Sequence, residues 1–168
     1  MTQTNQAAND LPLLEDRVTF LTHRVNARLQ QVSNPVIAGF GLDLYSSRVL
    51  FALEQNGAMK VGQLVELMAL PQSTISHQLK RMEKDGLIRR TRSETDNRTV
   101  HISVTESGAK ATEVCTRLSN LVQERISDEF TQDELAALTD GLKRVFDVLK
   151  TVPSLETLAT EYSQSAAE

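Results

Sequence analysis

The sequence lacks several features that would place it in common classes of protein. It contains a single cysteine, Cys115, which rules out an internal disulfide framework. No apolar run approaches the roughly 18 residues that a membrane span needs, so insertion into a membrane is excluded. The N-terminal segment MTQTNQAAND has neither the basic region nor the apolar core of a signal peptide. These absences predict a cytoplasmic protein.

Motifs for catalysis and metal binding are also missing from the sequence. We find no nucleophile elbow, no phosphate-binding loop and no dinucleotide fingerprint, which argues against an enzyme and against a bound cofactor. The histidines His23, His77 and His101 have no ligand-like spacing with one another or with Cys115. Because a metal sensor needs several donors that converge on one point, no metal site is expected.

The chain does contain a strongly uneven charge distribution. Its net charge is −4, yet the segment 72–98 holds seven basic and four acidic side chains and is therefore locally positive. A protein with this balance should not bind polyanions over its whole surface, because the positive field is confined to one place. With 40% hydrophobic residues, the chain has enough apolar material for the core of one compact domain.

Hydrophobic periodicity predicts a chain that is mainly helical. Apolar residues recur every three or four positions from Leu14 to Val32, which indicates a long amphipathic helix that Asn34-Pro35 would end. Shorter helices are expected over 43–54 and 61–68, and two more helices follow residues typical of N-caps. These two N-cap residues are Thr105 and Thr131.

The segment 72–84 predicts a helix with one buried and one presented side. At about 100° per residue, Ile75, Leu79 and Met82 fall together and form the side that docks on the protein. The remaining surface offers hydroxyl, imidazole, amide and cationic groups, which are the types that reach base edges and phosphates of DNA. The candidate DNA-binding residues of this helix are Ser73, Thr74, Ser76, His77, Gln78, Lys80 and Arg81.

After the helix-ending pair Asp85-Gly86, the period of the sequence changes to that of a β-hairpin, with strands near 87–88 and 100–104. The loop between the strands is rich in arginine, and a narrow minor groove favours an inserted guanidinium. Asp96 lies close enough in sequence to hold Arg98 in an extended pose for reading DNA, although a simple surface ion pair is the alternative. The candidate DNA-binding residues of the wing are Arg90, Arg92, Asp96 and Arg98, and Arg89 is expected to be structural or to face a phosphate.

Helix, tight turn, helix and hairpin together predict a winged helix-turn-helix, whose second helix enters the major groove. The patterns STISHQLKRMEKDGLIRR and TDNRTVHISVTESG resemble those of the MarR (multiple antibiotic resistance regulator) family of transcription factors, and the resemblance extends over residues 11–150. This resemblance implies a homodimer whose two winged lobes bind a pseudopalindromic site. It also implies a small-molecule effector that binds between the dimerisation region and the DNA-binding lobe.

The residue patterns and the resemblance together predict how the chain is organised. The fold class is mainly α with a small β-hairpin wing, and the protein is dimeric through long N- and C-terminal helices. The expected parts are a flexible N-terminus (1–10), a helical dimerisation region (11–34 and 106–152), a winged helix-turn-helix lobe (43–105) and a C-terminal tail (153–168) that is disordered from Glu161 onward.

The expected function is that of a ligand-responsive, sequence-specific transcriptional regulator. Its simplest form is a repressor that a small aromatic carboxylate or phenol releases from double-stranded DNA. The candidate effector-binding residues are His23, Arg24, Tyr45 and Arg48, because a guanidinium suits a carboxylate, and each of them also fits a dimer interface or the surface. Two alternatives stay open: a winged-helix module for protein–protein contact, and a redox-responsive regulator that uses Cys115, for which a packed small residue is the simpler interpretation.

Overall fold

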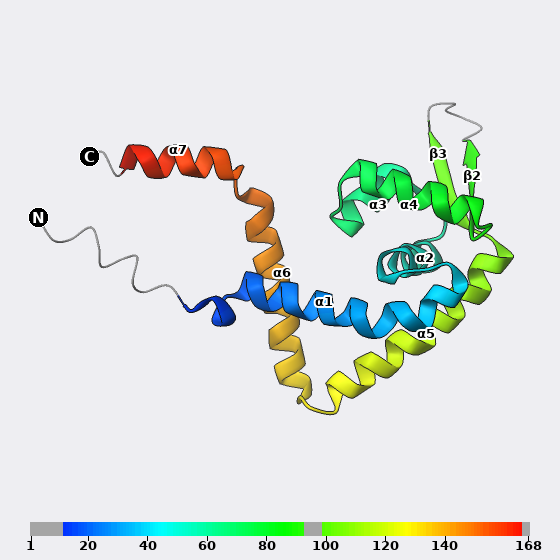
Figure 1. The fold of residues 1–168 in the computed structure, drawn as a ribbon, viewed down its shortest axis with the longest axis horizontal. Helices are drawn as coiled ribbons and strands as arrows, with labels where there is room; N and C mark the ends of the chain where they lie inside the picture. The colour runs from blue at the N-terminus through cyan, green and yellow to red at the C-terminus, as the bar shows by residue number, and fades with distance from the viewer. Residues whose placement is uncertain (1–11, 93–98, 166–168) are drawn as a thin grey trace, which may run out of the picture. The chain divides into compact units, whose positions relative to one another are not determined.

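The computed structural model describes residues 12–92 and 99–165, and these fall into two compact units, one within Met1–Ser119 and one within Asn120–Glu168. The chain is mainly helical and has a small three-stranded antiparallel sheet in the first unit (Figure 1). This confirms the predicted winged, mainly helical fold. The elements are η2 (Leu14–Asp16), α1 (Val18–Ile37), η3 (Ala38–Phe40), α2 (Leu44–Asn56), β1 (Met59–Lys60), α3 (Val61–Met68), α4 (Gln72–Lys84), β2 (Ile88–Arg92), β3 (Val100–Val104), α5 (Glu106–Ser127), α6 (Gln132–Thr151) and α7 (Leu155–Ser165).

The long helix α1 does not end at Asn34-Pro35, as the sequence predicted, but continues through Pro35 to Ile37. A proline this close to the C-terminal end removes only one intrahelical hydrogen bond, to the carbonyl of Gln31, and the helix tolerates that loss. Asn34 has a different role from the predicted one. Its side-chain Oδ1 accepts a hydrogen bond from the backbone N–H of Leu44 at 2.9 Å, and so ties α1 to the start of α2.

Helices α3 and α4 occupy the predicted ranges, and α2 ends two residues beyond the predicted end at residue 54. Asp43 caps α2 with its side chain, which accepts a hydrogen bond from the N–H of Ser46. Between α3 and α4 the chain turns sharply at Ala69, which has a left-handed backbone with φ of 50°. Pro71 is the N-cap of α4 and provides no side-chain cap, and its extended backbone (φ −54°, ψ 142°) leads the chain into the helix at Gln72. The turn therefore sets α4 beside α3 as the second helix of a helix-turn-helix.

The sheet has the strand order β1-β3-β2, and all of its pairs are antiparallel. The predicted hairpin of β2 and β3 is confirmed, with Arg90 opposite Ile102 in the register. Strand β1 was not predicted, because a two-residue strand is too short to show alternation. Its Met59 pairs with Ile102 and closes the second edge of β3.

The core of the first unit lies between the helices and the sheet. Leu50 of α2, Leu64 of α3, Ile75 and Leu79 of α4 and Ile102 of β3 are all fully buried in one cluster. Each such side chain contributes about 1.5–3 kcal/mol by leaving water. In Figure 1, α3 and α4 lie on one side of α2, and the β2–β3 hairpin stands next to α4. This packing fixes the buried side of α4 and leaves its other side free.

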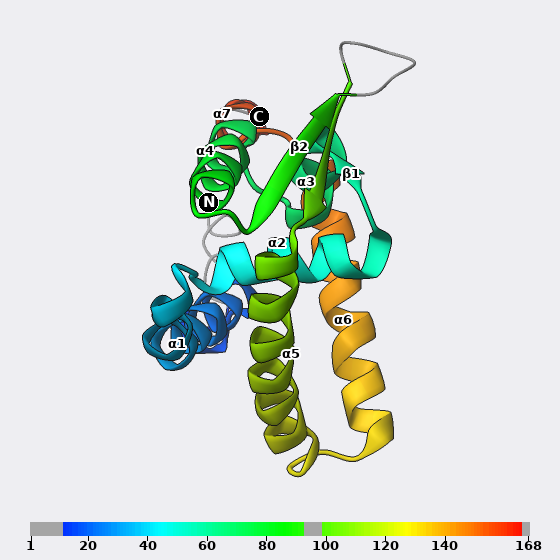
Figure 2. The ribbon, with the colours of Figure 1, turned by 90° about the vertical axis from the view of Figure 1, so that its right-hand side faces the viewer.

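A tight joint links the wing to α5, which follows β3 directly (Figure 2). The Thr105 hydroxyl donates to the carbonyl of Gly86 at 2.6 Å and accepts from the N–H of Gly108 at 3.0 Å, which confirms Thr105 as the predicted cap. The backbone N–H of Thr105 donates to the carbonyl of Leu87 at 3.1 Å. A Cβ at position 108 would lie 1.9 Å from the same Leu87 oxygen, so only glycine fits there. We call these four residues the wing joint.

The second unit contains the end of α5 and the helices α6 and α7. Helix α6 begins with the predicted capping box, in which Thr131 and Glu134 exchange hydrogen bonds. The tail was expected to be disordered from Glu161 onward, but residues 161–165 belong to the helix α7. The hydroxyl of Ser154 accepts a hydrogen bond from the N–H of Thr157 at 3.2 Å and so caps α7.

Many large apolar side chains remain exposed in both units. On α1 they include Leu21, Val25 and Val32, with 43%, 60% and 41% of their surfaces exposed. Those on the helices of the second unit include Leu121, Leu138, Leu142, Phe146 and Leu149. Within the described ranges no single helix is long and apolar enough to cross a membrane, and only α1–η3 and α2, bent by 72°, pass as a pair. Of this pair, α2 supplies residues to the core of the first unit.

Candidate nucleic-acid interface

Five of the seven predicted side chains of α4 share one exposed surface. Ile75 and Leu79 anchor the opposite side of the helix in the core, with none of their surface exposed. Helical geometry therefore turns the intervening positions outward. The exposed candidates are Ser73, Thr74, Ser76, His77 and Lys80. The surface combines hydroxyl, imidazole and ammonium groups on a single helix. The major groove of DNA is wide enough to admit one α-helix.

The other two candidates of α4, Gln78 and Arg81, contact the protein itself. The Arg81 Nη2 donates to Oδ2 of Asp43 at 2.8 Å, and the Gln78 Nε2 donates to the same oxygen at 3.3 Å. Both side chains are half-buried. The structure thus places these two residues on the flank of α4 that faces the start of α2. No pattern in the sequence pointed to Asp43 as their partner, because Asp43 lies 35 and 38 residues away.

The Asp43 carboxyl has a pKa well below its ordinary value. Burial raises its pKa, but hydrogen bonds from the Ser46 N–H, the Arg81 guanidinium, the Ser46 hydroxyl and the Gln78 amide favour the ionised form. Together the hydrogen bonds outweigh the effect of burial, and the pKa falls from 3.8 to about 2. Asp43 is therefore a carboxylate at any physiological pH.

The described part of the wing presents arginines on β2. Arg92 is exposed, and Arg90 pairs with Glu83 of α4 at 2.9 Å. Arg89 donates from Nε to the hydroxyl of Ser103 on the neighbouring strand at 3.0 Å, which gives it a structural contact within the hairpin. The predicted pair Asp96 and Arg98 lies outside the described residues.

The four candidate effector residues do not form one cluster. The Tyr45 hydroxyl accepts hydrogen bonds from the side-chain amides of Asn26 and Gln30, at 3.2 and 3.4 Å. Arg48 donates to Oδ1 of Asn26 at 3.5 Å. Asn26 and Gln30 are thus two polar groups that the sequence analysis missed, although a helical wheel would place them on one side of α1. Tyr45, Arg48 and these amides form the α1–α2 polar contact.

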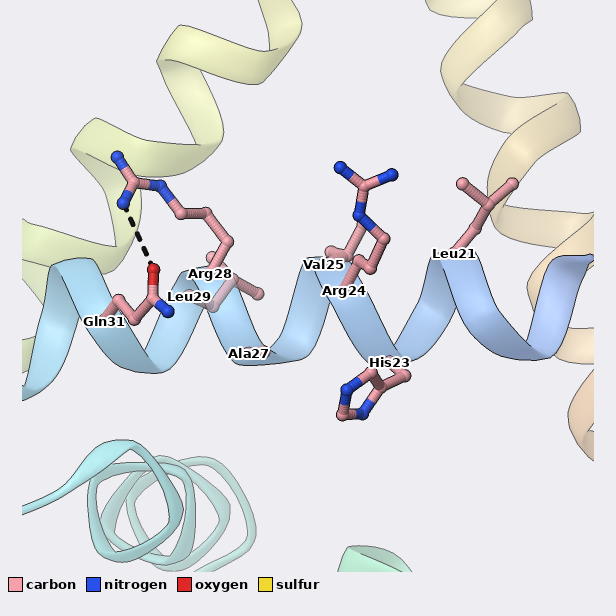
Figure 3. A pocket seen from close by; sticks show the side chains of 8 residues that line it. All are labelled: Leu21, His23, Arg24, Val25, Ala27, Arg28, Leu29 and Gln31. Atoms are coloured by element: carbon pink, nitrogen blue, oxygen red, sulfur yellow. Dashed lines mark hydrogen bonds between the residues drawn. The ribbon is translucent and has the colours of Figure 1, made fainter. Parts of the chain in front are cut away.

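The other two effector candidates, His23 and Arg24, lie farther along α1. They border an open hollow of about 700 Å³ that is lined by α1 residues between Leu21 and Gln31. His23 stacks against Phe20 with ring centroids 6.3 Å apart, and it points to the opposite side of the helix from Arg24 (Figure 3). The residues that line the hollow all belong to α1.

Cys115 is packed in the core with 3% of its surface exposed. Burial raises the pKa of its thiol, which keeps the group protonated and poorly nucleophilic. This geometry favours the interpretation as a packed small residue over a redox sensor. Within residues 12–92 and 99–165 there is no group of three or more His, Cys, Asp or Glu side chains that could hold a metal ion.

Fold and exposed helix together define a winged helix-turn-helix protein, and comparisons with known proteins narrow the class. The MarR family profile matches residues 45–100. The transcriptional regulator MgrA of Staphylococcus aureus is 31% identical over 134 residues, which cover 79% of this chain and 89% of the relative. The chain belongs to the MarR family of transcriptional regulators. The family and the relatives that match this chain are transcriptional regulators and not enzymes.

Two solved structures are similar to this chain in fold. One is AbsC, a MarR family transcriptional regulator from Streptomyces coelicolor, with a TM-score of 0.69 and 26% identity over 80% of this chain and 93% of AbsC. The other is a MarR mutant from E. coli in complex with operator DNA, with a TM-score of 0.68 and 21% identity over 80% of this chain and 99% of that one. At that identity the second likeness shows the fold alone.

Proposed function

We propose that this protein binds a pseudopalindromic operator as a homodimer, in the cytoplasm, and represses transcription until a small effector releases it. The observation that carries the proposal is the exposed polar surface of α4, held in place by a buried apolar side. Ser73, Thr74, Ser76, His77 and Lys80 are the groups that would contact bases and phosphates. Arg90, Arg92 and Arg98 would add contacts from the wing, with Asp96 orienting Arg98.

The proposed dimer rests on the apolar side chains that each protomer leaves exposed. A monomer that exposes this many large apolar groups on helices is unusual, and a matching surface of a second copy would cover them. Two recognition helices in a two-fold dimer meet half-sites about one helical turn, or roughly 34 Å, apart. We assign the dimerisation region to 11–34 and 106–152 and the DNA-binding lobe to 43–105.

The proposed effector is an aromatic carboxylate or a phenol, because the candidate residues include two guanidinium groups. Arg48 lies at the α1–α2 polar contact, and Arg24 borders the open hollow on α1. His23 and Tyr45 would supply further hydrogen bonds to such a ligand. An effector that shifts α1 against α2 would change the distance between the two recognition helices, and the loss of simultaneous binding would weaken the complex more than the loss of any one contact.

The test is a selection of fragments from random and genomic DNA by the purified protein, at several salt concentrations. We expect a pseudopalindrome whose affinity falls steeply with salt. A Lys80→Gln variant removes two phosphate-facing charges per dimer and should reduce the slope of log K against log salt by about 2. The matched control is Lys110→Gln, on the exposed side of α5, where Lys110 pairs with Glu106 and the slope should not change. Recovery of no DNA by a folded dimer would refute the proposal.

A further inference from the structure

The two oxygens of the Asp43 carboxylate serve different elements. Oδ1 accepts hydrogen bonds from the N–H and the hydroxyl of Ser46, both at 2.8 Å, and so caps α2. Oδ2 accepts from Arg81 at 2.8 Å and from Gln78 at 3.3 Å, and so contacts the recognition helix α4. The Asp43 side chain therefore caps the start of α2 and also holds α4.

We propose that Asp43 is a positioning residue for DNA binding, which retains Arg81 and Gln78 against the lobe so that they dock the recognition helix instead of reading DNA. The proposal rests on the function proposed above, and it assigns to these two residues a role different from that of their exposed neighbours on α4. We call Asp43, Gln78 and Arg81 the α4 clamp.

The spacing of the clamp residues explains how it fixes α4. Gln78 and Arg81 are three residues apart, so they lie on one flank of the helix, about 4.5 Å apart along its axis. The core contacts of Ile75 and Leu79 hold the helix on the lobe, but apolar contacts are non-directional and do not by themselves set the roll of the helix about its axis. Two attachments on the flank prevent that roll. The angle at which the exposed residues meet the groove is set in this way.

Two polar atoms of the clamp are turned away from the surface. The Arg81 Nε and the Gln78 Oε1 are buried, and neither has a hydrogen-bond partner among the described residues. Atoms in this position are not offered to a base edge or a phosphate. The ends of the Arg81 side chain are less covered, since 40% of the side chain is exposed, so the guanidinium lies near the boundary of the lobe. Released from Asp43, it would be able to reach DNA.

Asp43 itself is held firmly. Its backbone N–H donates to the hydroxyl of Ser46 at 2.8 Å, and the next residue, Leu44, is bound through its N–H by Asn34 of α1. The low pKa of the carboxyl, about 2, agrees with a charge that is fully satisfied by its donors. The clamp therefore joins α4 to a fixed point where α1 and α2 meet.

The experiment compares the salt dependence of operator binding by four full-length proteins: the wild type, Asp43→Asn, Arg81→Gln and the double variant. Asparagine keeps an oxygen for the Ser46 cap, but it turns an amide toward the donors of α4 and removes the charge that retains Arg81. We expect Asp43→Asn to steepen the salt slope by about 2 per dimer, because two arginines become free for phosphates. We also expect its preference for operator over random DNA to fall at least about tenfold, because α4 is less firmly oriented.

The arginine variants decide whether Arg81 binds DNA in the wild type. We expect Arg81→Gln to keep the wild-type slope, and the double variant to return to that slope, whereas Lys80→Gln reduces it. If Arg81→Gln reduces the slope as much as Lys80→Gln does, Arg81 is a phosphate contact and the proposal is overturned. An Asp43→Asn protein with unchanged slope and preference overturns it as well. Should Asp43→Asn not fold, the slope of Arg81→Gln alone decides.

The proposed function fails in a distinguishable way. A wild-type dimer that binds no DNA refutes both the proposed function and the role of Asp43. Operator binding by the wild type, with the wrong slopes in the variants, refutes only the role of Asp43. Urea unfolding of each variant shows that the compared proteins are folded.

Discussion

The replacement of Gly108 by alanine tests the account of the wing joint most directly. The added Cβ would lie 1.9 Å from the carbonyl oxygen of Leu87 and 2.8 Å from Cγ1 of Val104. A carbon and a carbonyl oxygen normally approach no closer than about 3.3 Å, so the Leu87 backbone would have to retreat by more than about 1 Å. That movement would break the 3.1 Å hydrogen bond from the Thr105 N–H to the same oxygen.

The magnitude follows from these contacts. Overpacking of this kind costs about 1–3 kcal/mol, and the loss of a buried backbone hydrogen bond costs about 1 kcal/mol more. The better helix propensity of alanine offsets up to about 1 kcal/mol. We therefore expect Gly108→Ala to lower the free energy of unfolding by about 1–4 kcal/mol. The assay is urea unfolding followed by far-ultraviolet circular dichroism, at one fixed protein concentration because a dimer is more stable when concentrated.

The matched control is Gly62→Ala on α3. No described atom lies within 4 Å of its added Cβ, so this variant should be as stable as the wild type or gain up to about 1 kcal/mol. A Gly108→Ala protein that unfolds at the wild-type urea concentration or above, next to a Gly62→Ala control that behaves as expected, would refute the steric reasoning.

Three further predictions concern charge and the thiol. Asp43, with a pKa of about 2 in the folded protein and an ordinary value of 3.8, stabilises the fold fully above that ordinary value, and a contribution of up to about 2 kcal/mol is lost as the pH falls toward 2. Asp43→Asn should flatten this part of a urea-midpoint profile against pH, and parallel profiles for the two proteins would contradict it. Cys115 should react with a thiol reagent many times more slowly in the folded protein than in urea, and equal rates would show that it is accessible. Glu83→Gln should free Arg90, change stability by less than about 1 kcal/mol and strengthen DNA binding at low salt, and weaker binding would show that the Glu83–Arg90 pair is needed for recognition.

The parts of the fold that the sequence predicted are those with strong local signals. The buried side of α4 follows from the spacing of Ile75, Leu79 and Met82, and all three are buried. The hairpin follows from a change of period, and the capping of α5 from Thr105. Each of these signals lies within one turn or one strand of the structure that it specifies.

The parts that were missed or wrong depend on contacts across the chain. The extension of α1 past Pro35 is supported by the bond of Asn34 to the start of α2, which no local pattern announces. Strand β1 exists only because β3 lies beside it. A helical wheel places Gln78 and Arg81 near the surface of α4, but it does not show that both side chains donate hydrogen bonds to Asp43. For this reason the sequence predicted the exposed surface of α4 better than its edge.

The strand order β1-β3-β2 has a consequence for solubility. It leaves β2 with one edge unpaired within the described part of the sheet, and an unpaired edge is a template on which another chain can add a strand. In this protein, that edge strand carries Arg89, Arg90 and Arg92, whose charges repel an identical strand from a second molecule. The wing arginines would therefore protect the protein from aggregation while it is off DNA. Engineering that replaces them with apolar residues should be expected to reduce solubility as well as DNA binding.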